Sequence, residues 1–573
     1  SRGLGDVYKR QPYKRVTIEE IKAVMDDVLA RTRNAKSVDE ILAAREDYLK
    51  LLCDYRTAES LSYMRYSINT VDEFYVAEKD YYDEIGPEAE NYMVQYASTL
   101  LDSPFRAELE ERLSPVLFKH LEVSRKSMSP EIIDDLVEEN KLVSEYSKLM
   151  ASLEFEFRGE TLPRAMLMKY AKSDDRETRR EAYEVLGKVL KEHSAELDDI
   201  YDRMVHVRDR MAKKMGYKNY VELGYHRMGR IDYDQDKVKT FRENVLNDIV
   251  PVVSRLRTEN AKRLGIDHVM CYDEKMVFPD GNAEPAGDDA FMVKTAQKMY
   301  HEISPETGEF IDFMIDHELM DLQNKPGKAS TGYMTSLPSL KAPFVFSCFN
   351  HTIFDMQVLT HELGHAFAGY MAMRSQPISD YYSESTDIAE IHSMSMEQFA
   401  YPYAEWFFGD QADKFRFAHL QEALTFVPFG VAVDEFQHIC YAHPELTPKE
   451  RTYQWHLLEE KYMPWRKYDN DAFMERGGYW YHKLHIYLYP FYYINYTLTT
   501  MGAMEFKKKY AEDRDAAWQD YLNLCKTGGS RSYLETLRYA NLSNPFEAGS
   551  VARACGYAED ILLKQIAEQA QDV

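Results

Sequence analysis

Helical periodicity runs through most of this 573-residue chain and constrains its fold more than any other feature. Within residues 18–28, Ile, Val and Met recur at the spacing of one helix face, set between Glu, Lys and Asp. A stripe of this kind predicts an amphipathic helix with one buried face. Similar stripes continue to about residue 265 and return, richer in aromatic residues, from 352 to 568. The sequence therefore predicts a mainly α fold.

Residues 341–349 interrupt this pattern with a short apolar segment. After Lys341 the segment carries no charge, and it is rich in aromatic residues with Gly and Pro on its flanks. These features predict a β-strand in otherwise helical surroundings.

The acidic balance of the chain limits its partners. With 70 basic and 96 acidic side chains the net charge is −26. This argues against nucleic acid or an anionic membrane surface, because both are bound through clusters of Lys and Arg. No stretch approaches the roughly 20 apolar residues of a membrane span. Cationic or neutral substrates such as peptides are compatible with this charge.

The six cysteines are scattered along the chain, with no CxxC motif and no close pair. This spacing is typical neither of a disulfide framework nor of a thiolate metal site. We therefore expect reduced, mostly buried thiols in a cytoplasmic protein.

The segment His361–His365 reads His-Glu-Leu-Gly-His and places two imidazoles on one face of a predicted helix. Side chains four residues apart project from the same face, so both can bind one Zn²⁺. Glu362 lies about 100° around the helix, where it can reach a metal-bound water without occupying the metal. Residues 356–373 carry no charge other than Glu362, which predicts a buried helix whose carboxylate needs a polar partner.

A zinc ion in such a site needs a third protein ligand and an open position for water. The pattern HExxHxxGxxH is excluded, because Ala368 and Met371 occupy its last two places. A Glu on a following helix is the other common solution, and Glu390 stands on a helix expected to begin at a Ser or Asp. Spacing alone leaves three competing carboxylates, Glu384, Asp387 and Glu397.

A second group of polar side chains lies further along the chain. His485, Tyr489, Tyr492 and Tyr496 stand at i, i+4, i+7 and i+11, which is one face of a predicted helix. Aimed at the metal, these donors would stabilise the oxyanion that forms when water attacks a peptide carbonyl. The alternative is an aromatic core stripe with satisfied hydroxyls. The place of His482, expected on the same helix, stays open.

Together these motifs resemble the thimet oligopeptidase and oligoendopeptidase F family of zinc peptidases. The resemblance extends from about residue 216 to about residue 530, and it is strongest in Thr360–Phe367, at Glu390 and in His485–Tyr496. The thimet branch commonly has a further His where this chain has Ala368. The chain is therefore nearer to the bacterial oligoendopeptidase F-like branch.

The resemblance implies a site and a fold. It implies that His361, His365 and Glu390 hold one zinc ion per chain, and that His485, Tyr489 and Tyr496 include the transition-state donors. It also implies two mostly helical lobes around a deep channel, with a small β-sheet beside the zinc. In that arrangement the strand at 343–349 could bind a substrate backbone by strand addition.

The length of the chain predicts two lobes or domains. We expect residues 1–11, which have no initiator Met and no apolar signal core, to be a non-native or disordered leader. Residues 12–160 are expected to form an N-terminal helical lobe, and residues 161–573 the catalytic metallopeptidase domain.

These observations predict a cytoplasmic zinc endopeptidase that hydrolyses internal bonds of short unstructured peptides, with Glu362 as general base. We expect neither nucleic acid nor a membrane as a partner. The alternatives are a zinc carboxypeptidase or dipeptidyl carboxypeptidase and, more remotely, a non-catalytic peptide-binding protein. The sequence leaves the side-chain preference and the oligomeric state open.

Overall fold

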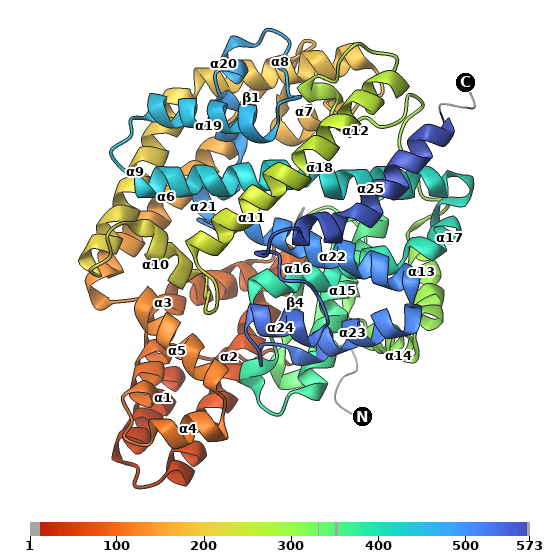
Figure 1. Cartoon of the computed structure of the whole chain (residues 1–573). Coiled ribbons are helices and arrows are strands. Elements are labelled where there is room, and N and C mark those ends of the chain that lie inside the picture. Colours follow the sequence, from red (N-terminus) through yellow and green to blue (C-terminus); the bar gives the residue numbers. More distant parts are fainter. Residues whose placement is uncertain (1–11, 330–331, 350–352, 570–573) are drawn as a thin grey trace. The chain divides into compact units, whose positions relative to one another are not determined.

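The computed structural model describes residues 12–329, 332–349 and 353–569 (Figure 1). The chain divides into two compact units. Unit 1 comprises the chain up to Lys126 together with Ala283–Asp413 and Gly502–Ser543, and unit 2 comprises Ser127–Asn282, Lys414–Met501 and the chain from Asn544 onward. The predicted leader, residues 1–11, lies outside the described residues. The boundary predicted at residue 160 falls inside unit 2, and the division into an N-terminal lobe and a catalytic domain stays a prediction.

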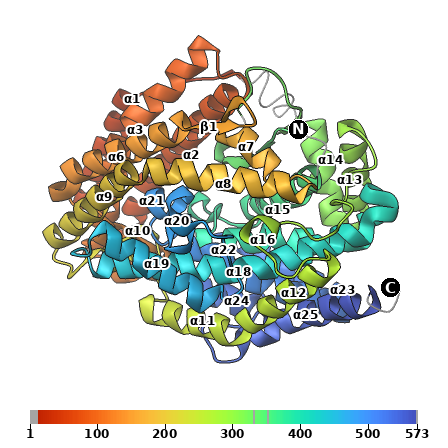
Figure 2. The same ribbon diagram turned by 90° about the horizontal axis from the view of Figure 1, so that it is seen from above.

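Unit 1 consists mostly of helices and contains one small sheet. Its elements are α1 (Ile18–Asn34), α2 (Val38–Ile68), α3 (Glu73–Leu101), α4 (Arg106–Arg112), α5 (Pro115–Ser127), α13 (Asp289–Ile303), α14 (Pro305–Asp316), β3 (Met320–Asp321), β4 (Tyr333–Leu337), β5 (Ala342–Phe346), α15 (Ile353–Ser375), α16 (Thr386–Phe399), α17 (Ala404–Phe408), α23 (Arg514–Thr527) and α24 (Tyr533–Tyr539). Helices α15, α16 and α23 pack against one another, and Figure 2 shows α15 beside α16 from a second side.

Unit 2 is also mostly helical. Its elements are α6 (Ile133–Ser152), β1 (Glu154–Phe157), β2 (Glu160–Pro163), α7 (Arg164–Tyr170), α8 (Arg176–Glu192), α9 (Ser194–Lys214), α10 (Tyr220–Arg227), α11 (Gln235–Asp248), α12 (Val250–Arg263), α18 (Ala412–Ala442), α19 (Pro448–Tyr462), α20 (Ala472–Glu475), α21 (Leu484–Leu488) and α25 (Ser550–Gln569). Helix α22 (Ile494–Glu512) begins in unit 2 and continues into unit 1. Figures 1 and 2 show α25 lying along α11 and α12.

The mainly α fold is confirmed, and the helical patterns explain it. The stripe in residues 18–28 forms the core face of α1, where Ile21, Met25 and Val28 are buried. Thr17 caps this helix, because its side chain accepts a hydrogen bond from the Glu20 N–H while Glu20 reaches back to the Thr17 N–H. Among the described residues, no helix combines the length and the apolar character that crossing a bilayer requires.

The predicted strand is present as β5, in the middle of a three-stranded sheet with the order β3-β5-β4. It pairs with β4 antiparallel and with β3 parallel, and all five of its residues are buried. The sheet packs on α15, which confirms the expected small sheet beside that helix. The hypothesis that this strand receives a substrate backbone is wrong, because β5 already has a neighbour on each side. The hairpin of β1 and β2 was not predicted.

Candidate metal centre

Helix α15 carries the His-Glu-Leu-Gly-His segment, as the sequence predicted. One apolar stripe of this helix is buried, with each side chain at most 4% exposed, in agreement with the prediction of a buried helix. It consists of Met356, Leu359, Leu363, Phe367 and Tyr370. His361 and His365 project from the side of the helix opposite to this stripe, and Glu362 lies between the two sides. All three are partly buried.

Gly364 lets α16 approach α15 closely. A Cβ atom at this position would lie 2.7 Å from the Cα of Ser393 and 3.1 Å from the Cβ of Met396. Any larger residue would therefore push the two helices apart. This close crossing brings Glu390, which is buried on α16, next to the two histidines.

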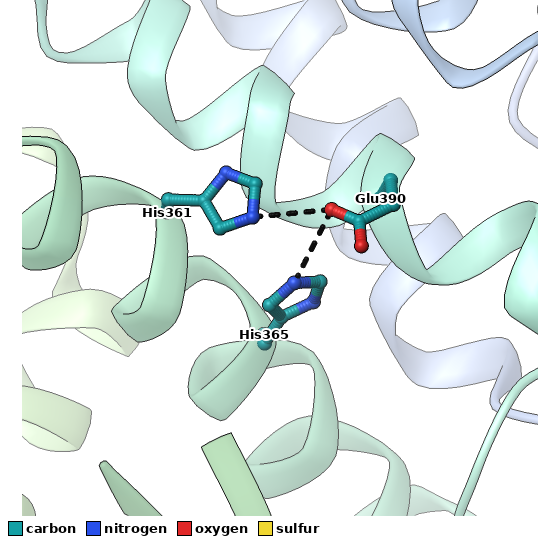
Figure 3. Close-up of side chains that lie close together, drawn as sticks. All are labelled: His361, His365 and Glu390. Atoms are coloured by element: carbon teal, nitrogen blue, oxygen red, sulfur yellow. Dashed lines mark ion pairs between the residues drawn. The ribbon is translucent and has the colours of Figure 1, made fainter. Parts of the chain in front are cut away.

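Three side chains from these two helices converge on one point (Figure 3). The Nε2 atoms of His361 and His365 lie 3.1 and 3.4 Å from the same oxygen, Oε2 of Glu390. One ligand atom from each residue lies within 4.8 Å of the other two. The sequence-predicted trio is thus brought together, with two donors from α15 and one from α16.

Two carboxylates determine the electrostatics of this group. Burial lowers the pKa of His361, but hydrogen bonds with Glu390 and Glu397 outweigh it, so this pKa lies well above its ordinary value. Burial raises the pKa of Glu390, but hydrogen bonds with His361 and His365 outweigh it, so this pKa lies well below its ordinary value. The site therefore favours a positive charge between the imidazoles and Glu390.

The three competing carboxylates have other partners. Oε1 of Glu397 lies 2.6 Å from Nδ1 of His361, which orients that ring. Glu384 pairs with Nδ1 of His392 at 3.2 Å, and Asp387 accepts a hydrogen bond from Ser385. Sequence reasoning missed the orienting role of Glu397, although its spacing of two helical turns from Glu390 places both on one face of α16.

The donor set fits a zinc ion. Two imidazoles and a carboxylate are among the ligands that zinc prefers, and three protein ligands leave the fourth position that catalytic sites keep open. In a tetrahedral site with bonds of about 2.0 Å, two ligand atoms lie roughly 3.3 Å apart. The two observed nitrogen–oxygen distances, 3.1 and 3.4 Å, are close to this separation.

The predicted helix through His485 and Tyr496 is broken, so the prediction of a single helical face is wrong. Helix α21 ends at Leu488, and α22 begins only at Ile494. The reason is Pro490, which has no N–H and disfavours the helical conformation at the preceding residue. Phe491 then adopts a left-handed conformation with φ of 61°. Pro490 was the signal in the sequence that could have predicted the break.

The side chains nevertheless cluster within unit 2. The ring of His485 lies 5.7 Å from that of Tyr489 and 6.1 Å from that of Tyr496, between ring centroids. Tyr492 lies 5.5 Å from Tyr496. Tyr489 is 49% exposed, and the other three are partly buried. The group is therefore neither a fully buried core stripe nor a regular helix face.

His485 is held neutral in this cluster. Burial, with a smaller contribution from the charge of Lys483, lowers the pKa of His485 to about 4. Its Nδ1 atom is buried and has no hydrogen-bond partner among the described residues. His482 lies in a separate 3₁₀ turn, Gly478–His482, rather than on the same helix as His485. Its Nδ1 contacts the carbonyl of Tyr479.

The protein is thus mainly helical, and two of its packed helices bring two histidines and a glutamate together in a geometry that suits a metal ion. Residues 8–128 match the Peptidase M3 N-terminal domain, and residues 169–285 and 290–554 match Peptidase family M3. The second match covers more than half of the chain, and the chain therefore belongs to Peptidase family M3. This confirms the resemblance to the oligoendopeptidase F-like peptidases.

Two relatives are named for the same kind of protein. The chain is 24% identical over 234 residues to an "Oligoendopeptidase F homolog" of Borreliella burgdorferi (strain ATCC 35210 / DSM 4680 / CIP 102532 / B31), covering 39% of this chain and 38% of that protein. It is 21% identical over 399 residues to "Oligopeptidase PepF" of Bacillus subtilis (strain 168), covering 66% and 57%. The chain thus spans less than two thirds of the length of both relatives.

Solved structures match over nearly the whole chain. The structure of PZ peptidase A with inhibitor 2 is 44% identical, with a TM-score of 0.90, and the match covers 97% of this chain and 99% of that one. A protein of Bacillus anthracis str. Ames, provisionally named an oligoendopeptidase F, is 41% identical with a TM-score of 0.86, covering 98% and 99%. Both have the fold described above.

Proposed function

We propose that this protein is a zinc-dependent oligoendopeptidase that hydrolyses internal bonds of short, unstructured peptides. The observation that carries the proposal is the convergence of His361, His365 and Glu390 on one point in a chain of Peptidase family M3. The names of the two bacterial relatives, which contain oligopeptidase and oligoendopeptidase, support the substrate class.

His361 and His365 through Nε2, and Glu390 through Oε2, would hold one Zn²⁺ per chain. A bound zinc ion supplies a Lewis acid that polarises the scissile carbonyl and lowers the pKa of a water. Glu397 accepts the Nδ1 proton of His361, which leaves Nε2 of the neutral ring free to act as a ligand. Glu384 is paired with His392 on the same helix as Glu390.

Glu362 moves the proton in this proposal. It stands on α15 directly after His361 and is only partly buried. Its carboxylate takes a proton from the attacking water and delivers it to the nitrogen of the leaving amine.

His485, Tyr489 and Tyr496 are proposed to donate hydrogen bonds to the oxyanion of the tetrahedral intermediate. The clustering of their rings and the unpartnered Nδ1 of His485 support this assignment. Because the pKa of His485 is about 4, its imidazole is neutral at pH 7 and carries one N–H.

The proposal also places the reaction in the cytoplasm. All six cysteines are free thiols in this structure, and the reducing compartment is where scattered, unpaired cysteines are expected.

Mass spectrometry of cleavage products tests the proposal. The purified protein is incubated with a length-graded peptide set and with a folded protein, with and without a metal chelator. Internal cuts that are confined to short peptides and stop with the chelator are expected. Loss of residues only from the C-terminus would indicate a carboxypeptidase, and no cleavage by a zinc-loaded sample would indicate a peptide-binding protein.

A further inference from the structure

The break between α21 and α22 leaves main-chain groups without their helical partners. In a continuous helix the carbonyl of Ile486 would accept a hydrogen bond from residue 490, and that of Tyr487 from residue 491. Residue 490 is a proline and has no N–H. Ile486, Tyr487 and Phe491 are all buried, and buried backbone groups require partners from elsewhere.

Gln437 supplies partners on both sides of the break. Its side chain is fully buried on α18. Its Nε2 lies 3.4 Å from the carbonyl oxygen of Ile486 and 3.3 Å from that of His485. Its Oε1 accepts a hydrogen bond from the N–H of Phe491 at 3.0 Å. The amide of Gln437 therefore donates to the Ile486 carbonyl in place of the N–H that Pro490 lacks. It also accepts the hydrogen bond from the Phe491 N–H, which in a continuous helix would go to the Tyr487 carbonyl.

Arg208 completes this arrangement at Tyr487. Its guanidinium is fully buried on α9 and donates to the Tyr487 carbonyl oxygen at 2.8 Å. The same side chain donates to Glu139 at 2.7 Å and to the Tyr441 hydroxyl at 2.8 Å. The charge of Arg208 is thus balanced by a carboxylate, and its remaining donors hold the segment.

The ring of Phe491 is enclosed as well. A Cβ atom added to Gly224 would lie 2.6 Å from this ring, and the ring of His438 lies 4.6 Å away. Arg230 donates to the Phe491 carbonyl and to the Asn495 side chain. The left-handed residue is therefore held through its N–H, its carbonyl and its ring.

We infer that Gln437 is a positioning residue for the proposed reaction. It fixes the break between α21 and α22, and thereby the placement of His485 and Tyr489 relative to Tyr496. The inference rests on the proposed function, because it assigns Gln437 to the donors of that reaction. Gln437 acts through the main chain on either side of Pro490, and Arg208 supports it at Tyr487.

The variant Gln437→Met tests this inference, because it keeps the size of the side chain and removes both ends of the amide. Gln421→Met is the matched control, since Gln421 is also a buried glutamine on α18. We expect Gln437→Met to lower kcat for a quenched fluorescent peptide by about 10- to 100-fold with little change in KM. Hydrogen exchange measured by mass spectrometry should become faster in 484–496 and stay unchanged in α15. The control should match the wild type in both measurements.

A double-mutant cycle with Tyr496→Phe separates positioning from general destabilisation. If Gln437 acts through the donors, the combined loss of kcat should be smaller than the product of the single losses. Arg208→Lys, which keeps the charge beside Glu139, provides the second measurement if Gln437→Met does not fold. For Arg208→Lys we expect the same faster hydrogen exchange in residues 484–496 and the same loss of kcat.

Two results would overturn the inference. One is unchanged exchange in 484–496, and the other is faster exchange with full activity; both leave the proposed function intact. A zinc-loaded wild type that cuts no peptide would overturn the proposed function and the catalytic part of this inference. Exchange in the same variants would still show whether Gln437 holds the segment.

Discussion

Two regions of this protein hold partly buried histidines in opposite electrostatic environments. Between α15 and α16, Glu390 and Glu397 outweigh burial and hold the pKa of His361 well above its ordinary value. In the broken segment of unit 2, burial and neighbouring cations lower the pKa of His482 to about 3 and that of His485 to about 4. The first region therefore favours a bound cation. In the second region the imidazoles stay neutral, and their N–H groups can donate hydrogen bonds to an anion.

The two regions also differ in how their side chains are placed. The metal-site residues stand on regular helices, where four-residue spacing and one close crossing at Gly364 bring them together. The segment that carries the proposed hydrogen-bond donors, residues 484–496, is irregular, and its geometry depends on contacts from other helices of unit 2. The first region should therefore respond to changes in its ligands and in helix packing. The second should respond to the loss of single hydroxyls and to the loss of the contacts that hold its main chain.

The largest effect is expected from Glu362→Gln. Without a carboxylate to move the proton, kcat should fall by about 10³- to 10⁴-fold, while bound zinc should be unchanged because Glu362 is not a proposed ligand. Peptide cleavage and metal content, measured on the same preparation, check this. Substantial remaining activity would remove Glu362 from its proposed role.

Tyr496→Phe tests the second region. If the hydroxyl stabilises the oxyanion, kcat should fall by about 10²- to 10³-fold with KM nearly unchanged. Tyr493→Phe is the control, because Tyr493 lies 4.9 Å from the ring of His485 but is not among the proposed donors. Equal kinetics for the two variants would return Tyr496 to an aromatic packing role.

Glu397→Gln tests the orientation of His361. Removing the carboxylate beside Nδ1 should weaken zinc binding by about 10- to 100-fold, as measured by competition with a chelator. Glu309→Gln is the control, since Glu309 also accepts a hydrogen bond from α15, through Tyr370 at 3.0 Å, without touching a histidine. The prediction fails if both variants bind zinc as the wild type does.

Gly364→Ala tests the helix crossing. The added methyl group has no room against α16, so the free energy of unfolding should fall by about 1–3 kcal/mol. Gly369→Ala is the control on the same helix, because its nearest neighbours lie at 3.5 Å or more, and it should be neutral or slightly stabilising. Denaturant unfolding measures both, and equal stability of the two variants would contradict the close crossing.

The smallest effect at neutral pH is expected from His482 and His485, two partly buried histidines of unit 2. Their pKa values are lower in the folded chain than the unfolded value of about 6.5, so their stabilising contribution is complete above that pH. It is lost as the pH falls toward 4 for His485 and toward 3 for His482, with a slope of at most about 1.4 kcal/mol per pH unit for each group.

Denaturant unfolding at several pH values between 7.5 and 4.5 measures this slope. His482→Gln should make it shallower, whereas His443→Gln, at a side chain that is 60% exposed, should leave it as in the wild type. Identical slopes for the two variants would rule out the contribution of His482.

The mainly α fold and the helix that carries His361 and His365 could be predicted from the order of residues alone, whereas choosing Glu390 over Glu384, Asp387 and Glu397 also needed the family resemblance. The fold class and this helix depend on interactions between residues a few positions apart, and such local patterns can be read from the sequence. Even the break at Pro490 was visible, since a missing N–H is a property of one residue.

How these parts are supported could be learned only from the contacts in the folded chain. The strand at Ala342–Phe346 lies inside its sheet rather than at an edge because β3 and β4 both pair with it. Glu397 meets His361 because two helices cross at a glycine. Gln437 meets the turn at Phe491 across 54 residues of sequence. Contacts of this kind join residues far apart in the chain, so they follow from packing as a whole rather than from local spacing.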